Sequence, residues 1–204
     1  MNHKFGNNDS DQYLVDKVLG GDTNAFGVII RNTEGLVAQI VFKMINNTED
    51  RKDIAQDVYL KAYHNLSGFK FQSKLSTWIG KIAYNSCLNT WEKKKSVLFD
   101  DWYESTETEK KAAGNKTDKA IPGTENEIEN ALFRKELSQI LNSEIQRLPP
   151  VYKILVTLYH NEELSYEEIA QITSLPEGTV KSYLFRARKV LKERLLLKYK
   201  REEL

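Results

Sequence analysis

Apolar residues recur at every third or fourth position along most of the chain, which is the pattern of amphipathic helices. Over the first 95 residues this pattern predicts helices throughout. The first helix is short, with Asp11 as its cap, and ends at Leu19 before two glycines. The second follows Asp22 and runs through Met44, and the third begins at Thr48. We therefore expect a wholly helical N-terminal domain.

The third and fourth helices of this domain have distinct apolar and polar faces. In the third helix a buried stripe is predicted from apolar residues one turn apart, namely Ile54, Val58 and Ala62. The polar residues that fall largely outside this stripe, and are free to meet a partner, are Asp53, Gln56, Asp57 and Lys61. The fourth helix begins near Ser76 and carries the apolar residues Trp78, Ile79, Ile82, Ala83 and Cys87 before a run of three lysines.

The segment between these two helices, residues 65–78, interleaves aromatic, cationic and amide side chains. They are Asn65, Phe69, Lys70, Phe71, Gln72, Ser73, Lys74 and Trp78. Such a mixture suits unpaired nucleic acid, because bases stack on aromatic faces, amides read base edges and lysines follow phosphates. The alternative is that Phe69, Phe71 and Trp78 are ordinary core residues, and the sequence leaves both interpretations open. From Lys61 to Lys95 there are 7 basic residues and 1 acidic residue.

Residues 165–195 have the pattern of a helix-turn-helix that ends in a basic helix. Ser165 and Glu168 have the spacing of a capping box, so a short helix is expected to begin there. Pro176 is typical of the first position of a second helix. The face expected to pack inward carries Val180, Leu184, Ala187, Leu191 and Leu195. The opposite face carries Lys181, Ser182, Arg186, Arg188, Lys189 and Lys192.

A basic amphipathic helix is by itself most often only a solvated face. Here the capping box, the tight turn and the proline start favour DNA binding instead. From residue 176 to residue 201 there are 9 basic residues against 2 acidic ones. The first turns, with Thr179, Lys181 and Ser182, are what a recognition helix inserts into a major groove, while later Arg and Lys residues reach phosphates.

Length and charge divide the chain into three parts. A chain of 204 residues with net charge +1 is long enough for two small domains. Residues 96–130 carry 9 acidic and 4 basic side chains and lose the apolar periodicity after Tyr103, as a flexible linker does. The predicted fold is therefore all-α, with a helical domain over 1–95, an acidic linker over 96–130 and a helix-turn-helix domain over 131–204.

Several function classes find no support in the sequence. No apolar run approaches the length of a membrane span and no secretory signal is visible, so we expect a cytoplasmic protein without membrane insertion. The single cysteine, Cys87, is expected to be a buried hydrophobe rather than a nucleophile. The three histidines, His3, His64 and His160, have no partners at ligand spacing. We therefore expect no metal, no cofactor, no catalytic residues and no enzymatic activity.

With both halves in view, the chain resembles the bacterial sigma-70 family of RNA polymerase sigma factors, and in particular the extracytoplasmic-function (ECF) group. DIAQDVYLKAYHNL at 53–66 is similar to the family's polymerase-binding helix. KLSTWIGKIAYNSCLNTWEKKK at 74–95 is similar to its promoter-melting and minus-10-reading helix. The segment 148–195, which contains the helix-turn-helix, is similar to its minus-35-binding domain. Three such motifs in the family's order are highly specific.

The resemblance implies partners and roles for individual residues. The partners are core RNA polymerase, at the clamp helices of its largest subunit and at its flap, and promoter DNA; an anti-sigma factor is a further candidate. Polymerase contacts fall on Asp53, Gln56, Asp57 and Leu60. Contacts with the minus-10 element fall on Asn65, Phe69, Lys70, Phe71, Gln72, Ser73, Lys74, Trp78, Asn85, Lys93, Lys94 and Lys95. Contacts with the minus-35 element fall on Thr179, Lys181, Ser182, Tyr183, Phe185, Arg186 and Lys189.

Two positions depart from the family pattern. Tyr183 stands where the family commonly has arginine, and Asn89 stands where it often has aspartate. We predict that Tyr183 tunes the minus-35 preference, although its ring can instead pack inward with only its hydroxyl in water. The competing functions are a helix-turn-helix regulator that acts without polymerase, a recombinase and a protein-binding adaptor. The first leaves 11–95 unexplained, and the second lacks the arginine cluster that its chemistry needs.

Overall fold

The computed structural model describes residues 8–94 and 127–202, and the regular elements in these two ranges are all helices. The N-terminal module consists of α1 (Asn8–Leu19), α2 (Thr23–Met44), α3 (Thr48–Asn65), a short 3-10 turn (Leu66–Gly68) and α4 (Leu75–Lys94). The C-terminal module consists of α6 (Glu127–Gln146), α7 (Pro150–His160), α8 (Tyr166–Thr173) and α9 (Glu177–Glu202). The predicted all-α fold is confirmed. Most of the predicted linker lies outside the described residues, and α6 begins at its residue 127.

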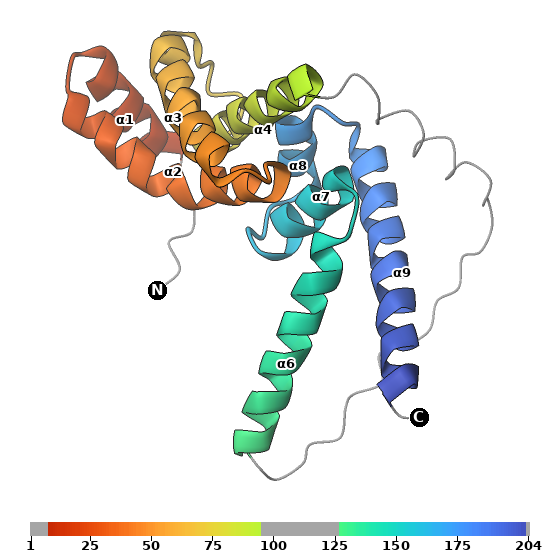
Figure 1. Cartoon of the computed structure of the whole chain (residues 1–204). Coiled ribbons are helices and arrows are strands. Elements are labelled where there is room, and N and C mark those ends of the chain that lie inside the picture. Colours follow the sequence, from red (N-terminus) through yellow and green to blue (C-terminus); the bar gives the residue numbers. More distant parts are fainter. Residues whose placement is uncertain (1–7, 95–126, 203–204) are drawn as a thin grey trace.

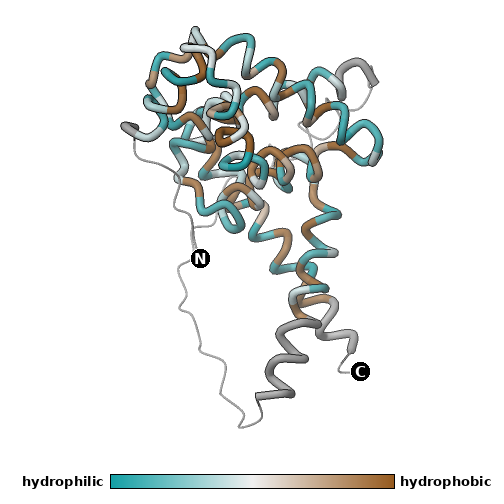
Figure 2. The backbone as a smooth tube through the Cα atoms, turned by 90° about the vertical axis from the view of Figure 1, so that its left-hand side faces the viewer, coloured by the Kyte–Doolittle hydropathy of each residue, from teal (hydrophilic) through white to brown (hydrophobic). Residues whose placement is uncertain are grey.

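The N-terminal module is built around α2, which packs against α1, α3 and α4 (Figure 1). Asp22 caps α2, because its carboxylate accepts a hydrogen bond from the Asn24 amide at 3.0 Å. The predicted stripe on α3 is confirmed, since Ile54, Val58 and Ala62 are all buried. Apolar and hydrophilic positions alternate along each helix of the module, as expected for amphipathic helices (Figure 2).

Asp11 does not cap the first helix, contrary to the sequence prediction. The helix begins three residues earlier, at Asn8, so Asp11 lies inside it. Its carboxylate instead accepts a hydrogen bond from the Leu75 amide at 2.9 Å, at the start of α4. Burial raises the pKa of Asp11, and the bond to Leu75 and the charge of Lys74 oppose that rise. An aspartate of α1 therefore accepts a hydrogen bond from a free amide at the start of α4, 64 positions further along the chain.

The helix-turn-helix forms as the sequence predicts. The Glu168 amide donates to Ser165 Oγ at 3.1 Å, and the Ser165 amide donates to Glu168 Oε2 at 2.8 Å, which completes the capping box. Ser174 adopts a left-handed conformation with φ 57° and turns the corner between α8 and α9. Helix α9 begins one residue after Pro176. On its inner face Val180, Leu184, Ala187 and Leu191 are buried, and Leu195 is half-buried.

One helix departs from the expectation that no segment is long and apolar enough to span a membrane. By length and composition, α2 alone among the helices of the described ranges is long and apolar enough to cross a membrane. Eight of its side chains are buried in the protein, at Ala25, Ile29, Thr33, Leu36, Val37, Ile40, Val41 and Met44. These side chains, apolar except for Thr33, therefore pack against the neighbouring helices, as in the core helix of a globular bundle.

The two modules are in direct contact (Figure 1). Helix α8 packs on α4, and α7 packs on α2, so that the buried side chains of both modules form one continuous core. The distal halves of α6 and α9 extend away from this core (Figure 1). The contact between α4 and α8 joins a helix that carries part of the predicted nucleic-acid surface to a helix of the helix-turn-helix.

Candidate nucleic-acid interface

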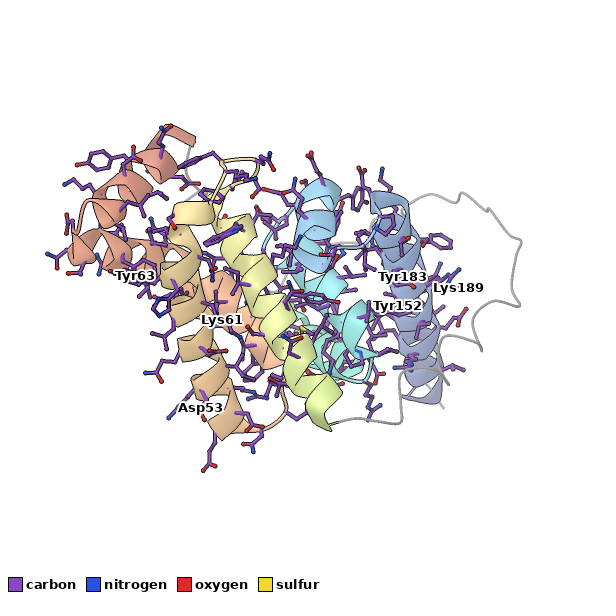
Figure 3. The ribbon with its side chains drawn as sticks, turned by 90° about the horizontal axis from the view of Figure 1, so that it is seen from above. Asp53, Lys61, Tyr63, Tyr152, Tyr183 and Lys189 are labelled. Atoms are coloured by element: carbon purple, nitrogen blue, oxygen red, sulfur yellow. The ribbon has the colours of Figure 1, made fainter. Side chains whose placement is uncertain are left out.

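The outer face of α3 presents the four residues to which the resemblance gives polymerase contacts. All four are exposed, and Leu60 keeps 56% of its surface in contact with solvent; the four are Asp53, Gln56, Asp57 and Leu60. Lys61 Nζ lies 2.6 Å from Asp57 Oδ2 and 3.1 Å from Ser86 Oγ of α4, which ties the edge of this face to the next helix. Asp53 and Lys61 both project from α3 in Figure 3. An exposed leucine one turn from a carboxylate is suited to a protein partner.

The loop before α4 is organised by an aromatic cluster. The ring of Phe69 lies 4.7 Å from that of Phe71 and 5.3 Å from that of Trp78, measured between centroids. Phe69 is only 7% exposed, whereas Phe71 and Trp78 are half-buried. Phe71 also has a φ of 55°, a conformation that non-glycine residues rarely adopt. Phe69 therefore supports the cluster from the core, and the other two rings have surface left for a ligand.

Beside this cluster lies a pocket of about 360 Å³, which we call the aromatic pocket. It is lined by Gly68, Phe69, Lys70, Gln72, Ser73, Thr77, Trp78, Lys81 and Gln171. Five of the predicted minus-10 residues thus come together around one space. Aromatic rings beside lysines and amides match the chemistry of an unstacked base with its phosphates. The sequence interpretation missed Lys81, although its position one turn after Trp78 on the same helix would have indicated it.

The other predicted minus-10 residues lie around the pocket rather than in it. The Nζ atom of Lys74 lies 2.8 Å from Glu168 Oε1 of α8, so its ammonium group forms an ion pair with that carboxylate. Asn65 is exposed, and its amide donates to the Lys61 carbonyl at 2.8 Å. Asn85 is exposed on α4. The side chains of Lys93 and Lys94, and the whole of Lys95, lie outside the described residues.

Helix α9 presents the predicted minus-35 residues on its outer face. Phe185 is 63% exposed, and the exposed cationic and polar residues around it are Lys181, Ser182, Arg186 and Lys189, with Thr179 half-buried at the start. Glu177 Oε1 lies 2.6 Å from Lys181 Nζ. This hydrogen bond and the charge of Glu177 raise the pKa of Lys181, which keeps the ammonium protonated. The face therefore has a positive charge and exposed apolar surface near its N-terminal end.

A stack of two tyrosines, which the sequence interpretation did not find, supports this face from α7 and α8. The rings of Tyr159 and Tyr166 lie 5.1 Å apart and nearly parallel, at 11°. The guanidinium of Arg188 lies 5.0 Å from the Tyr159 centroid, and the ammonium of Lys181 lies 5.4 Å from the Tyr166 centroid. Such contacts orient cations of α9 against a rigid aromatic surface. The two tyrosines come from separate helices, so no local pattern indicates the stack.

Tyr183 occupies the boundary between the core and the outer face of α9. It is half-buried, and its ring lies 5.4 Å from that of Tyr152 on α7. The Arg186 guanidinium lies 6.0 Å from the centroid of the same ring. Figure 3 shows Tyr152 and Tyr183 side by side where α7 meets α9. The ring thus contacts the core, while the helix position adjoins the cations of the outer face.

Two further titratable side chains in the described part of the chain are Cys87 and His160. Cys87 is fully buried, and burial raises its thiol pKa to about 12, which confirms that it is a buried hydrophobe. Within residues 8–94 and 127–202, no three His, Cys, Asp or Glu side chains are grouped so as to hold a metal ion. The pKa of His160 is lowered by burial and by the charge of Arg188.

Comparison with known proteins decides the family. Residues 29–97 match the family described as "Sigma-70 region 2", and residues 138–191 match "Sigma-70, region 4". The chain is 31% identical to the ECF RNA polymerase sigma factor SigW of Bacillus subtilis over 89% of this chain and 94% of that protein. It is 33% identical to the ECF RNA polymerase sigma-E factor of Escherichia coli K12 over 89% and 92%. The chain belongs to the ECF group of sigma-70 factors.

As an ECF sigma factor, the protein is a transcription initiation factor that directs RNA polymerase to promoters. Its fold is similar to that of CnrH, solved in complex with the cytosolic domain of CnrY, with a TM-score of 0.61, 19% identity and coverage of 91% and 97% of the two chains. It is also similar to the sigma factor RpoE of Bartonella quintana, solved with the anti-sigma factor NepR, with a TM-score of 0.56 and 19% identity over 83% and 96%. The relatives are named as sigma factors and not as enzymes.

Proposed function

We propose that this sigma factor binds core polymerase through the outer face of α3, holds the melted minus-10 strand at the aromatic pocket and anchors duplex minus-35 DNA with α9. The observation that carries the proposal is the separation of these surfaces. Region 2 and region 4 fall on different modules, and each module has its own exposed cationic surface. One domain, over 1–95, then serves polymerase binding and melting, and the other, over 131–204, serves minus-35 recognition.

Polymerase binding is assigned to Asp53, Gln56, Asp57 and Leu60 because they project from a helix whose opposite face is buried. Their expected partner is the clamp-helix region of the largest subunit. A second polymerase contact is proposed for the groove between α6 and α9, where exposed Leu141 and Leu196 lie among cationic side chains. The flap of the polymerase is the partner that we propose for this groove. Burial of these exposed leucines by a protein partner is favourable, because it removes apolar surface from water.

Minus-10 recognition is assigned to the aromatic pocket. A duplex hides its base faces, so an aromatic pocket is useful only to a strand whose base has left the stack. Half-buried Trp78 in the pocket and half-buried Phe71 beside it offer faces to such a base, and Lys70 and Lys81 offer charges to its phosphates. Capture of a flipped base stabilises the melted strand, and the pocket therefore assists promoter opening.

Minus-35 recognition is assigned to the outer face of α9. The first three turns of a recognition helix reach base edges, and cations further along reach phosphates. Lys181, Ser182 and Arg186 occupy the first of these positions, and Lys189 occupies the second. Phe185 provides apolar surface for a thymine methyl group. Duplex DNA therefore binds a surface that is separate from the aromatic pocket.

We also propose that the protein acts in the cytoplasm and that an anti-sigma protein binds it. The cytoplasm is where polymerase and promoters meet. The solved neighbours CnrH and RpoE were each captured with a second protein, CnrY and the anti-sigma factor NepR respectively. The exposed leucines of α3 and of the groove between α6 and α9 offer such a protein surface to cover.

The polymerase assignment is tested by a double substitution of Gln56→Ala with Asp57→Lys in the full chain. Both positions are exposed, so we expect an intact helical fold and a loss of affinity for core polymerase of about tenfold or more, as for reversal of a charge within an interface. Gln12→Ala with Asp16→Lys is the matched control, because it makes the same chemical changes at exposed positions of α1. Equal holoenzyme assembly by both variants would refute the assignment.

A further inference from the structure

Thr77 is a buried polar residue of the aromatic pocket. It lies in the first turn of α4, lines the pocket and keeps only 2% of its surface in contact with solvent. Its hydroxyl oxygen is shielded from solvent and has no hydrogen-bond partner among the described residues. A buried hydroxyl without a partner costs free energy, so its presence in a native fold calls for an explanation.

The position of Thr77 at the start of α4 explains why its hydroxyl lacks the usual partner. Helical threonines commonly donate to the carbonyl oxygen four residues earlier. Four threonines at other helical positions do so at 2.7 to 2.9 Å, namely Thr33, Thr90, Thr157 and Thr173. The corresponding carbonyl for Thr77 belongs to Ser73, which precedes the helix. The backbone therefore leaves this hydroxyl unpaired, and a ligand in the pocket is placed to pair with it.

The side chains of the pocket differ in depth. Lys70, Gln72 and Lys81 are exposed, Trp78 is half-buried and Thr77 is buried. Cations at the rim are placed for phosphates, and the aromatic ring is placed for the face of a base. A volume of about 360 Å³ is at the lower end of the range for small-ligand pockets, which suits a single nucleotide. A base that enters from the rim then turns its polar edge towards Thr77.

We propose that the Thr77 hydroxyl forms a hydrogen bond with the polar edge of the base captured in the aromatic pocket, and that Thr77 is thereby a specificity-determining residue. This inference rests on the proposed minus-10 function of the pocket. A hydroxyl can both donate and accept, so it pairs with a carbonyl oxygen, a ring nitrogen or an amino group. It rejects an apolar edge, because the hydroxyl then stays buried without a partner.

The unpaired hydroxyl predicts opposite effects of Thr77→Val on the free protein and on the complex. Valine keeps the branched side chain and removes the hydroxyl. In the free chain this removes a buried polar group that has no partner, so the melting temperature should stay the same or rise. In the complex it removes a hydrogen bond, so the preference for the captured base should fall. A residue that only fills space would not separate these two effects.

Two further variants serve as controls for Thr77→Val. Thr77→Ser keeps the hydroxyl and removes only the methyl group. Thr157→Val makes the same chemical change at a residue that is also 2% exposed, but whose hydroxyl donates to the Lys153 carbonyl at 2.9 Å. Loss of this satisfied hydroxyl should lower the melting temperature and leave the base preference unchanged.

Base capture is measured by fluorescence anisotropy with the full chain and short single-stranded oligonucleotides. Four oligonucleotides each carry one base, A, C, G or T, among abasic residues, and a fifth is entirely abasic and reports phosphate contacts alone. A sixth carries a non-polar isostere of the base that binds best. We expect the wild-type chain to bind that base about fivefold more tightly than its isostere, as for one neutral hydrogen bond.

Thr77→Val should bind the base and its isostere equally, whereas Thr77→Ser and Thr157→Val should keep the wild-type preference. All variants should bind the entirely abasic oligonucleotide with the same affinity. The base and its isostere, each measured with wild-type chain and with Thr77→Val, form a double-mutant cycle that isolates the hydrogen bond.

Other outcomes distinguish a failure of this inference from a failure of the proposed function. A preference that persists in Thr77→Val, or that is lost in Thr77→Ser, overturns the role of the hydroxyl. A lower melting temperature of Thr77→Val with weaker binding of every oligonucleotide also overturns it, because the hydroxyl then supports the fold. If the wild-type chain binds all one-base oligonucleotides and the abasic one equally, the pocket captures no base, and its minus-10 function is refuted together with the role of Thr77.

Discussion

At the scale of single residues, the boundary positions carry the most information. Tyr183 replaces an arginine common in the family, and from the sequence its ring is equally suited to DNA or to the core. The contact with Tyr152 at 5.4 Å gives this ring a packing role that a DNA-reading residue does not need. Phe69 is similar, since its burial makes it a support for Phe71 and Trp78 rather than a freely available stacking surface.

Contrary to the prediction made from the sequence, we now expect Tyr183→Arg to lower the melting temperature of the full chain and to leave the selected minus-35 sequence unchanged. The arginine loses the aromatic contact with Tyr152, which is typically worth about 1 kcal/mol. In a packed body of this chain's size that loss lowers the melting temperature by about 2 to 4 °C. Tyr183→Phe, which keeps the ring, is the control. An unchanged melting temperature with a salt dependence steeper by about one phosphate contact would instead place the side chain on DNA.

At the scale of helices, features that depend on contacts within a few residues could be predicted from the sequence, whereas features that depend on contacts between helices could not. The capping box of α8 lies within four residues, and both of its hydrogen bonds are present as predicted. The buried faces of α3 and α9 follow from helical spacing, and they too are confirmed. Asp11 was misassigned because its true partner, Leu75, belongs to another helix. The stack of Tyr159 on Tyr166 and the Gln171 wall of the pocket were not predictable for the same reason.

We expect α9 and the loop before α4 to make separable contributions to promoter binding. Arg186→Ala should weaken binding to fully duplex promoter, because a contact with a base edge is typically worth about 1 to 3 kcal/mol. Phe71→Asn should impair opening instead, and a pre-melted template should restore activity. Asparagine tolerates the positive φ of this position, so the substitution removes the ring without straining the backbone. Equal defects of both variants on duplex and pre-melted promoters would count against this division.

At the scale of the whole molecule, the arrangement of the two modules adds what the sequence cannot contain in any local pattern. The helices of each module follow from periodicity and caps. The contact between Gly80 and Ile172 instead depends on two complementary surfaces whose residues lie 92 positions apart in the sequence. The same contact brings Lys74 to Glu168 and so joins a predicted DNA-binding lysine to the helix-turn-helix. The sigma factor is thus one packed body, in which the buried side chains of both modules form one continuous core.

The most direct test of the central claim is run-off transcription with core polymerase, a promoter library and the full chain. An initiation factor that recognises minus-10 and minus-35 elements should produce defined transcription starts that core polymerase alone does not produce. The Gln56→Ala, Asp57→Lys variant should lose these starts, while the Gln12→Ala, Asp16→Lys control should keep them. The account would be contradicted if the chain bound promoter DNA but added no starts, as a helix-turn-helix regulator that acts without joining the polymerase would do.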